Sequence, residues 1–105
     1  MSTLPERDPQ GFLINLEDWS EDIATTIAQE HDITLSPAHW EIIDLLRGFY
    51  NDYQLSPAMR ILVRITKEKL GEEKGNSIHL LQLFPGSPAK LASKIAGLPK
   101  PTNCL

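Results

Sequence analysis

Length, composition and charge describe a chain that suits one small globular domain. Its 105 residues are 41% hydrophobic and 23% charged, which is enough for one modest core under an ordinary polar surface. No run approaches the roughly 18 apolar residues that cross a bilayer, the first residues lack the basic and apolar regions of a secretory signal, and a single cysteine cannot form an internal disulfide. We therefore expect a cytoplasmic protein that does not enter a membrane.

The net charge of −4 is distributed unevenly along the chain. Residues 1–59 carry eleven acids against two bases, whereas residues 60–105 carry eight bases against three acids. The C-terminal end therefore belongs to the basic half of an acidic protein. Such polarity can orient a partner during encounter.

Capping residues and apolar spacing predict two helices in regions without a Ser-Pro pair. Asn15 or Asp18 is expected to cap the first of them, and Asn76 a later one, because their side chains accept hydrogen bonds from free backbone N–H groups. Before the first helix, residues 12–14 allow a small β-hairpin but leave too little sequence for a sheet.

Three Ser-Pro pairs, at 36–37, 56–57 and 87–88, predict three further helix starts. Serine can cap the first turn, and proline at the next position has no N–H group to leave unpaired. Apolar residues recur at spacings of three and four after each pair. Gly71 and Gly97 are expected to end the second and third of these helices.

The last nine residues, GLPKPTNCL, differ from the helical segments. Pro99 and Pro101 disfavour helix and favour extended backbone. We therefore expect a mainly α fold, with a compact bundle of about five short helices in residues 1–97 and a flexible C-terminal arm in residues 98–105. Seven extended steps of about 3.3 Å would carry the thiol of Cys104 about 23 Å from the last helix.

Cys104 is the first candidate for chemistry. A thiol near a chain end is accessible, and its thiolate is the reactive form. Lys100 is close enough in sequence to lower the pKa of the thiol, whereas the terminal carboxylate acts in the opposite direction. Position alone leaves a functional and an incidental cysteine equally open.

The three histidines, His31, His39 and His79, show no metal-ligand spacing. Structural or surface roles are therefore expected for them, and neither a metal nor another cofactor is expected.

A basic stripe suggests a second class of function. Arg60, Arg64 and Lys67 lie at positions i, i+4 and i+7 of one predicted helix, which follows another helix after a short loop. This arrangement resembles a helix-turn-helix, so a DNA-binding regulator is an alternative. Against it, the chain is acidic and the stripe holds only three charges, which favours a solvated or protein-docking face.

Five sequence blocks, in this order, resemble the TusE/DsrC family of sulfur-relay proteins. They are LSPAHWEII (35–43), SPAMRILV (56–63), GEEKGNS (71–77), LFPGSPAK (83–90) and KIAGLPKPTNC (94–104). The last block is the most specific, because it combines a fixed spacing with a place at the chain end.

The resemblance implies a small helical sulfurtransferase with a flexible arm. Cys104 maps onto the family's penultimate cysteine, which accepts sulfane sulfur as a persulfide and carries it to another protein. The implied donor is a TusBCD-like or DsrEFH-like complex. The implied acceptor is an MnmA-like thiouridylase, which makes 2-thiouridine in tRNA, or a sulfite-reductase-type protein. The carrier would meet tRNA only indirectly.

Ser93 departs from part of the family's pattern. The DsrC branch has a second cysteine eleven residues before the first, and here that position is serine. An intramolecular disulfide is therefore impossible, which favours a TusE-like persulfide carrier over DsrC proper. The serine does not choose between tRNA thiolation, the expected route, and another sulfur-transfer route with a one-cysteine carrier. A DsrC-related role in dissimilatory sulfur metabolism remains the alternative.

Five basic residues are candidates for docking partners around the arm. They are Arg60, Arg64, Lys90, Lys94 and Lys100. Their charges are expected to attract an acidic partner surface or to favour the thiolate.

Overall fold

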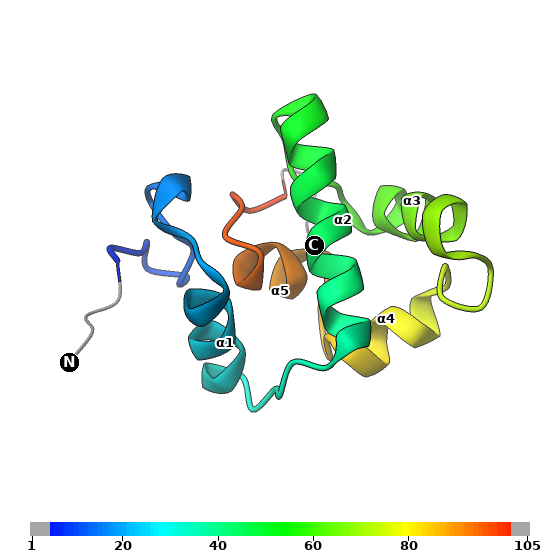
Figure 1. The fold of residues 1–105 in the computed structure, drawn as a ribbon, viewed down its shortest axis with the longest axis horizontal. Helices are drawn as coiled ribbons and strands as arrows, with labels where there is room; N and C mark the ends of the chain where they lie inside the picture. The colour runs from blue at the N-terminus through cyan, green and yellow to red at the C-terminus, as the bar shows by residue number, and fades with distance from the viewer. Residues whose placement is uncertain (1–4, 102–105) are drawn as a thin grey trace.

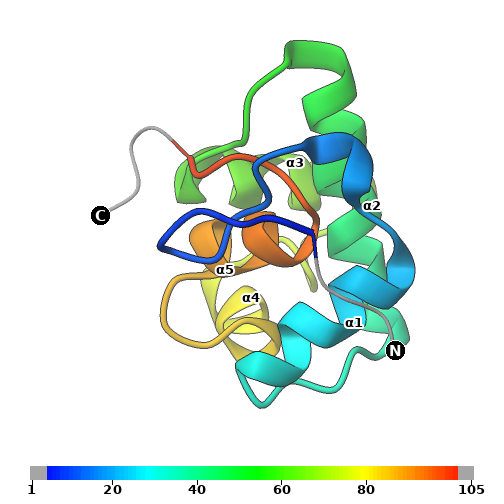
Figure 2. The ribbon, with the colours of Figure 1, turned by 90° about the vertical axis from the view of Figure 1, so that its left-hand side faces the viewer.

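Helix α5 (Pro88–Ile95) lies at the centre of the molecule and packs against all four other α-helices (Figures 1 and 2). The computed structural model describes residues 5–101. The surrounding elements are the 3₁₀ turn η1 (Leu16–Asp18) and helices α1 (Glu21–Glu30), α2 (Pro37–Tyr53), α3 (Met59–Leu70) and α4 (Ser77–Leu83). The prediction of a mainly α fold with five short helices is confirmed.

The core is built from one apolar face of every helix. Fully buried side chains come from all five α-helices and include Ile27, Ile42, Leu62, Leu80 and Ile95. Burying each such side chain contributes roughly 1.5–3 kcal/mol. Within residues 5–101 no helix is both long and apolar enough to cross a membrane.

The first Ser-Pro pair begins α2 as predicted, and His39 completes the cap. The Ser36 amide donates to His39 Nδ1 at 3.0 Å, so the ring proton lies on Nε2. His39 Nε2 therefore donates to the Leu83 carbonyl, 2.9 Å away. The buried imidazole joins the start of α2 to the end of α4, which is the structural role expected for it.

The prediction for the start of the first helix was wrong. Helix α1 begins at Glu21, and its N-cap is Ser20, whose hydroxyl accepts from the Ile23 amide at 3.2 Å. Asn15 instead caps the short η1 turn. The η1 turn and helix α1 are separate elements because Trp19, between them, adopts extended backbone with φ −71° and ψ 143°.

The helix start predicted from the second Ser-Pro pair was also wrong. Helix α3 begins at Met59, two residues after Pro57, and Ala58 is its N-cap. The Ser56 hydroxyl does not cap this helix, because it donates to the Pro99 carbonyl from the other end of the chain.

The expected N-terminal hairpin is reduced to one turn. Within the described residues, Arg7 and Leu13 form a single antiparallel bridge and no strand is present. The Asp8 carboxylate accepts from the Phe12 amide at 3.0 Å and closes the turn. Both guanidinium Nη atoms of Arg7 donate to the Glu30 carboxylate at 2.8 Å, which ties this turn to the end of α1.

Candidate functional site

Cys104, the predicted nucleophile, lies outside the described residues. The structure describes how the chain that leads to it leaves the body. We call residues 97–101 the anchored segment. Figure 2 shows this segment running from the end of α5 back alongside the connection between α2 and α3.

Gly97 sets the direction in which the chain leaves α5. Its φ is +75°, a conformation that L side chains rarely adopt. A Cβ at this position would lie 2.3 Å from Trp19 Cδ1. The indole therefore fills the space that any other residue would need. Trp19 Nε1 also donates to the Ile95 carbonyl at 2.9 Å, so the ring both packs against and caps the end of α5.

Arg47 holds the same turn from α2. Its guanidinium carbon lies 3.8 Å above the centre of the Trp19 ring, and its Nη1 donates to the Ala96 carbonyl at 2.7 Å. Burial lowers the pKa of Arg47, whereas nearby Asp44 raises it. A cation at a helix C-terminus also meets the negative end of the helix dipole. Trp19 and Arg47 thus bind two carbonyls that a helix end would leave free.

The residues after the turn pack against the body. Leu98 is only 2% exposed and belongs to the main core cluster, and Pro101 is fully buried. Between them, the Ser56 hydroxyl donates to the Pro99 carbonyl at 2.5 Å. Lys100 is exposed. The first part of the expected arm is therefore held against the body by Leu98, Pro99 and Pro101, while Lys100 faces solvent.

The predicted docking residues do not form one cluster. Arg60 and Arg64 are exposed on α3, close in sequence to Ser56, which bonds the anchored segment. Lys90 and Lys94 are half-buried on α5. Figure 1 places α1 and α3 on opposite sides of α5.

Lys94 faces the N-terminal turn and α1. Its Nζ lies 3.4 Å from His31 Nε2 and 5.4 Å from the centre of the Phe12 ring. Burial lowers the pKa of Lys94, and the charges of Lys90 and Arg7 lower it further. Burial and Lys94 likewise lower the pKa of His31. Lys94 therefore packs within the fold, while Arg60 and Arg64 stay open to a partner.

Ser93 lies in the middle of α5 and is fully buried. Within residues 5–101 its hydroxyl has no hydrogen-bond partner. A buried hydroxyl in this state carries a desolvation penalty without compensation.

In the part of the chain that the structure describes, no group of three or more His, Cys, Asp or Glu side chains could hold a metal ion.

Comparisons of sequence agree on one family. The model of the family described as DsrC like protein matches residues 2–105. Sulfurtransferase TusE of Sodalis glossinidius is 56% identical over 98 residues, which cover 93% of this chain and 91% of that protein. Sulfurtransferase TusE of Escherichia coli is 51% identical over 100 residues, covering 95% and 92%.

Solved structures show the same relationship. The NMR structure of DsrC from Allochromatium vinosum is 48% identical, has a TM-score of 0.85, and is matched over 93% of this chain and 88% of that one. The crystal structure of DsrC from Archaeoglobus fulgidus, the oxidized gamma-subunit of the dissimilatory sulfite reductase, is 38% identical. Its TM-score is 0.83, with 96% and 92% of the two chains covered.

The fold and the anchored segment define a small helical domain that holds its C-terminal chain against a central helix. With a family model that matches residues 2–105, the chain belongs to the DsrC-like family.

Sequence reasoning missed the three side chains that hold the end of α5 and the anchored segment. The Ser-Pro pair predicts that Ser56 caps a helix, and a first helix capped by Asn15 or Asp18 would contain Trp19. Arg47 left a usable signal, because it is one of only two bases among the first 59 residues. An isolated base in an acidic helix indicates a specific partner, here the Ala96 carbonyl.

Proposed function

We propose that this protein is a sulfurtransferase that carries sulfane sulfur as a persulfide on Cys104. One observation supports this above the others: the segment leading to the cysteine is held by side chains from separate parts of the fold, namely Trp19, Arg47 and Ser56. That the relatives are named Sulfurtransferase TusE agrees with this activity.

The chemistry requires no oxidant or cofactor. The Cys104 thiolate attacks the outer sulfur of a donor persulfide, a new S–S bond forms on Cys104, and the donor's S–S bond breaks. The donor leaves as a thiolate, which takes up a proton. An acceptor thiolate then attacks the outer sulfur on Cys104, and the carrier regains its thiol.

The anchored segment limits how far the thiol can travel. While Pro101 stays buried, three residue steps separate it from Cys104, a reach of about 10 Å. The fully extended arm expected from sequence would reach more than twice as far. The body must therefore come close to each partner, or the anchored segment must detach.

The proposed partners rest on the resemblance to TusE together with the one-cysteine pattern. Ser93 prevents a disulfide within the chain, so the two-cysteine cycle of the DsrC branch is not available. We infer a TusBCD-like donor, an MnmA-like thiouridylase as acceptor and 2-thiolated wobble uridine in tRNA as the product. The proposed place of action is the cytoplasm. DNA binding is not proposed, because α3 also carries Glu68 and its Lys67 forms a salt bridge with Glu72 at 3.7 Å.

Arg60, Arg64 and Lys100 are the proposed docking charges for an acidic partner surface. We expect Arg64→Gln and Lys100→Gln each to slow sulfur uptake by about twofold to tenfold at low salt, since rim charges act mainly on association. Lys94→Gln is the matched control, because Lys94 contacts His31 and Phe12. An unchanged rate for Arg64→Gln at low salt would reject its docking role.

The acceptor is tested by following radiolabelled sulfur. Protein loaded by a cysteine desulfurase and the donor complex is separated from both, then mixed with the thiouridylase, ATP and tRNA. The proposal predicts that label enters tRNA only with wild-type carrier and thiouridylase together. Label that passes to a sulfite-reductase-type acceptor and never to tRNA would contradict the tRNA assignment.

A further inference from the structure

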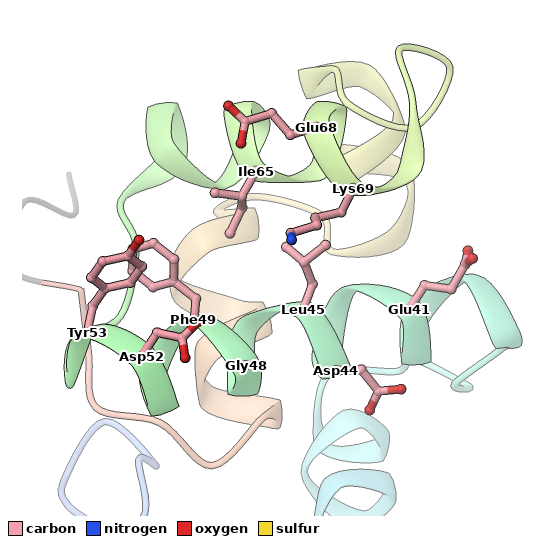
Figure 3. Close-up of a pocket in the computed structure, with 10 residues that line it drawn as sticks. All are labelled: Glu41, Asp44, Leu45, Gly48, Phe49, Asp52, Tyr53, Ile65, Glu68 and Lys69. Atoms are coloured by element: carbon pink, nitrogen blue, oxygen red, sulfur yellow. The ribbon is translucent and has the colours of Figure 1, made fainter.

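A groove between α2 and α3 is separate from the anchored segment. It has a volume of about 540 Å³ and is lined by residues from 41–53 of α2 and 65–69 of α3. In Figure 3, Leu45 on α2 and Ile65 and Lys69 on α3 point toward one another across it. Its size falls within the range of binding sites.

The groove has an apolar part that remains partly open to solvent. Leu45, Phe49, Tyr53 and Ile65 line it. The Phe49 and Tyr53 rings pack on each other with centres 4.7 Å apart, yet Tyr53 is 63% exposed. Leu45, Phe49 and Ile65 are partly buried. Partly buried apolar side chains beside an exposed aromatic ring, gathered in one hollow, are typical of an interaction surface.

The rim of the groove is acidic. Glu41, Asp44, Asp52 and Glu68 line it, together with Lys69 as a single base. Glu41 is paired with a lysine outside the groove, at 2.7 Å. Within residues 5–101 no base forms a salt bridge with the other three carboxylates. The potential therefore attracts a cationic occupant and repels nucleic-acid phosphates.

Gly48 leaves room for another molecule at this face. It lies in the interior of α2, where glycine weakens a helix relative to alanine. A Cβ at this position would meet nothing within 4 Å, so packing within the chain does not require glycine. Glycine leaves the α2 backbone uncovered at the groove, so another molecule can approach it closely.

We propose that this groove docks a basic amphipathic helix of a partner protein. Its apolar side chains contact Leu45, Phe49 and Ile65, as in other complexes where a helix lies in a groove. Its lysine or arginine side chains pair with Asp52 and Glu68, and one of them can lie over the exposed Tyr53 ring. The proposal does not depend on Cys104 or on the sulfur chemistry.

The test uses a synthetic helical peptide with leucines on one face and lysines and arginines on the other. Added to isotope-labelled protein, it should shift amide NMR signals mainly in residues 41–53 and 65–69. The double variant Asp52→Asn/Glu68→Gln should weaken binding about tenfold. Glu21→Gln/Asp22→Asn removes the same charge from α1 and should change binding little. Equal weakening in both double variants would overturn the proposal.

Gly48→Ala separates docking from stability. It should raise the thermal unfolding midpoint by about 4 °C, because alanine favours the helix. It should also weaken peptide binding about fivefold, because the added methyl group occupies the space beside the α2 backbone. A variant that is more stable and binds the peptide as tightly as wild type would overturn the proposal. A wild-type dimer that Gly48→Ala dissociates would also overturn it, because the occupant would then be a second copy of this chain.

Discussion

Gly97 is the residue on which the path of the anchored segment depends most. Its left-handed φ and its contact with Trp19 exclude every side chain for two separate reasons. Gly86 shares the first reason, with φ +91°, but a Cβ there would meet nothing within 4 Å. The two glycines therefore allow conformational strain to be separated from steric conflict.

We expect Gly97→Ala to lower the free energy of unfolding by about 1–3 kcal/mol more than Gly86→Ala does, because only the former displaces the indole. Urea unfolding followed by tryptophan fluorescence measures both. Equal losses in the two variants would show that Trp19 does not restrict this turn.

Ser93 gives a second test at the scale of one residue. Its buried hydroxyl lacks a partner among residues 5–101, so Ser93→Ala should leave stability unchanged or raise it by about 1 kcal/mol. Sulfur uptake should be unaffected, because a one-cysteine carrier needs no group at this position. Loss of uptake with normal stability would give Ser93 a chemical role that the proposed mechanism does not include.

Local signals predicted most helices but not the contacts that hold the anchored segment. Ser36 and Asn76, the N-caps of α2 and α4, form hydrogen bonds with residues only three positions away, so the sequence alone indicates them. Trp19 and Ser56 bond to Ile95 and Pro99, which are 76 and 43 residues away. Periodicity and capping rules carry no information at such separations, so the sequence alone indicates neither contact.

The N-terminal turn and α1 are joined by a pH-dependent contact. The hydrogen bond from Arg7 holds the pKa of Glu30 below its usual value of 4.5. A lowered carboxyl pKa contributes stability above pH 4.5, and this contribution is lost as the pH falls through the folded-state pKa.

We therefore expect Glu30→Gln to be less stable than wild type at neutral pH and equally stable in acid. The difference should be modest, since the pair is partly exposed. Chemical unfolding of both proteins across this range measures it. A difference that stays constant from neutral pH to well below pH 4.5 would contradict the ion pair.

On the scale of the whole molecule, the fold divides its surface between two proposed tasks. The anchored segment runs beside the start of α3, where Arg60 and Arg64 are exposed, and it leads toward Cys104. The acidic groove lies between α2 and α3 and is lined by residues from 41–53 and 65–69. The acidic half of the sequence supplies three of the four groove carboxylates, Glu41, Asp44 and Asp52. Arg60 and Arg64 belong to the basic half.

The central claim is that Cys104 carries the sulfur, and intact-mass measurement tests it most directly. Wild-type protein and Cys104→Ser are each incubated with a cysteine desulfurase, cysteine and the donor complex. We predict that wild type gains the mass of one sulfur atom, that a reductant removes it, and that Cys104→Ser gains nothing. The same reversible gain in Cys104→Ser, or no gain in wild type, would contradict the account.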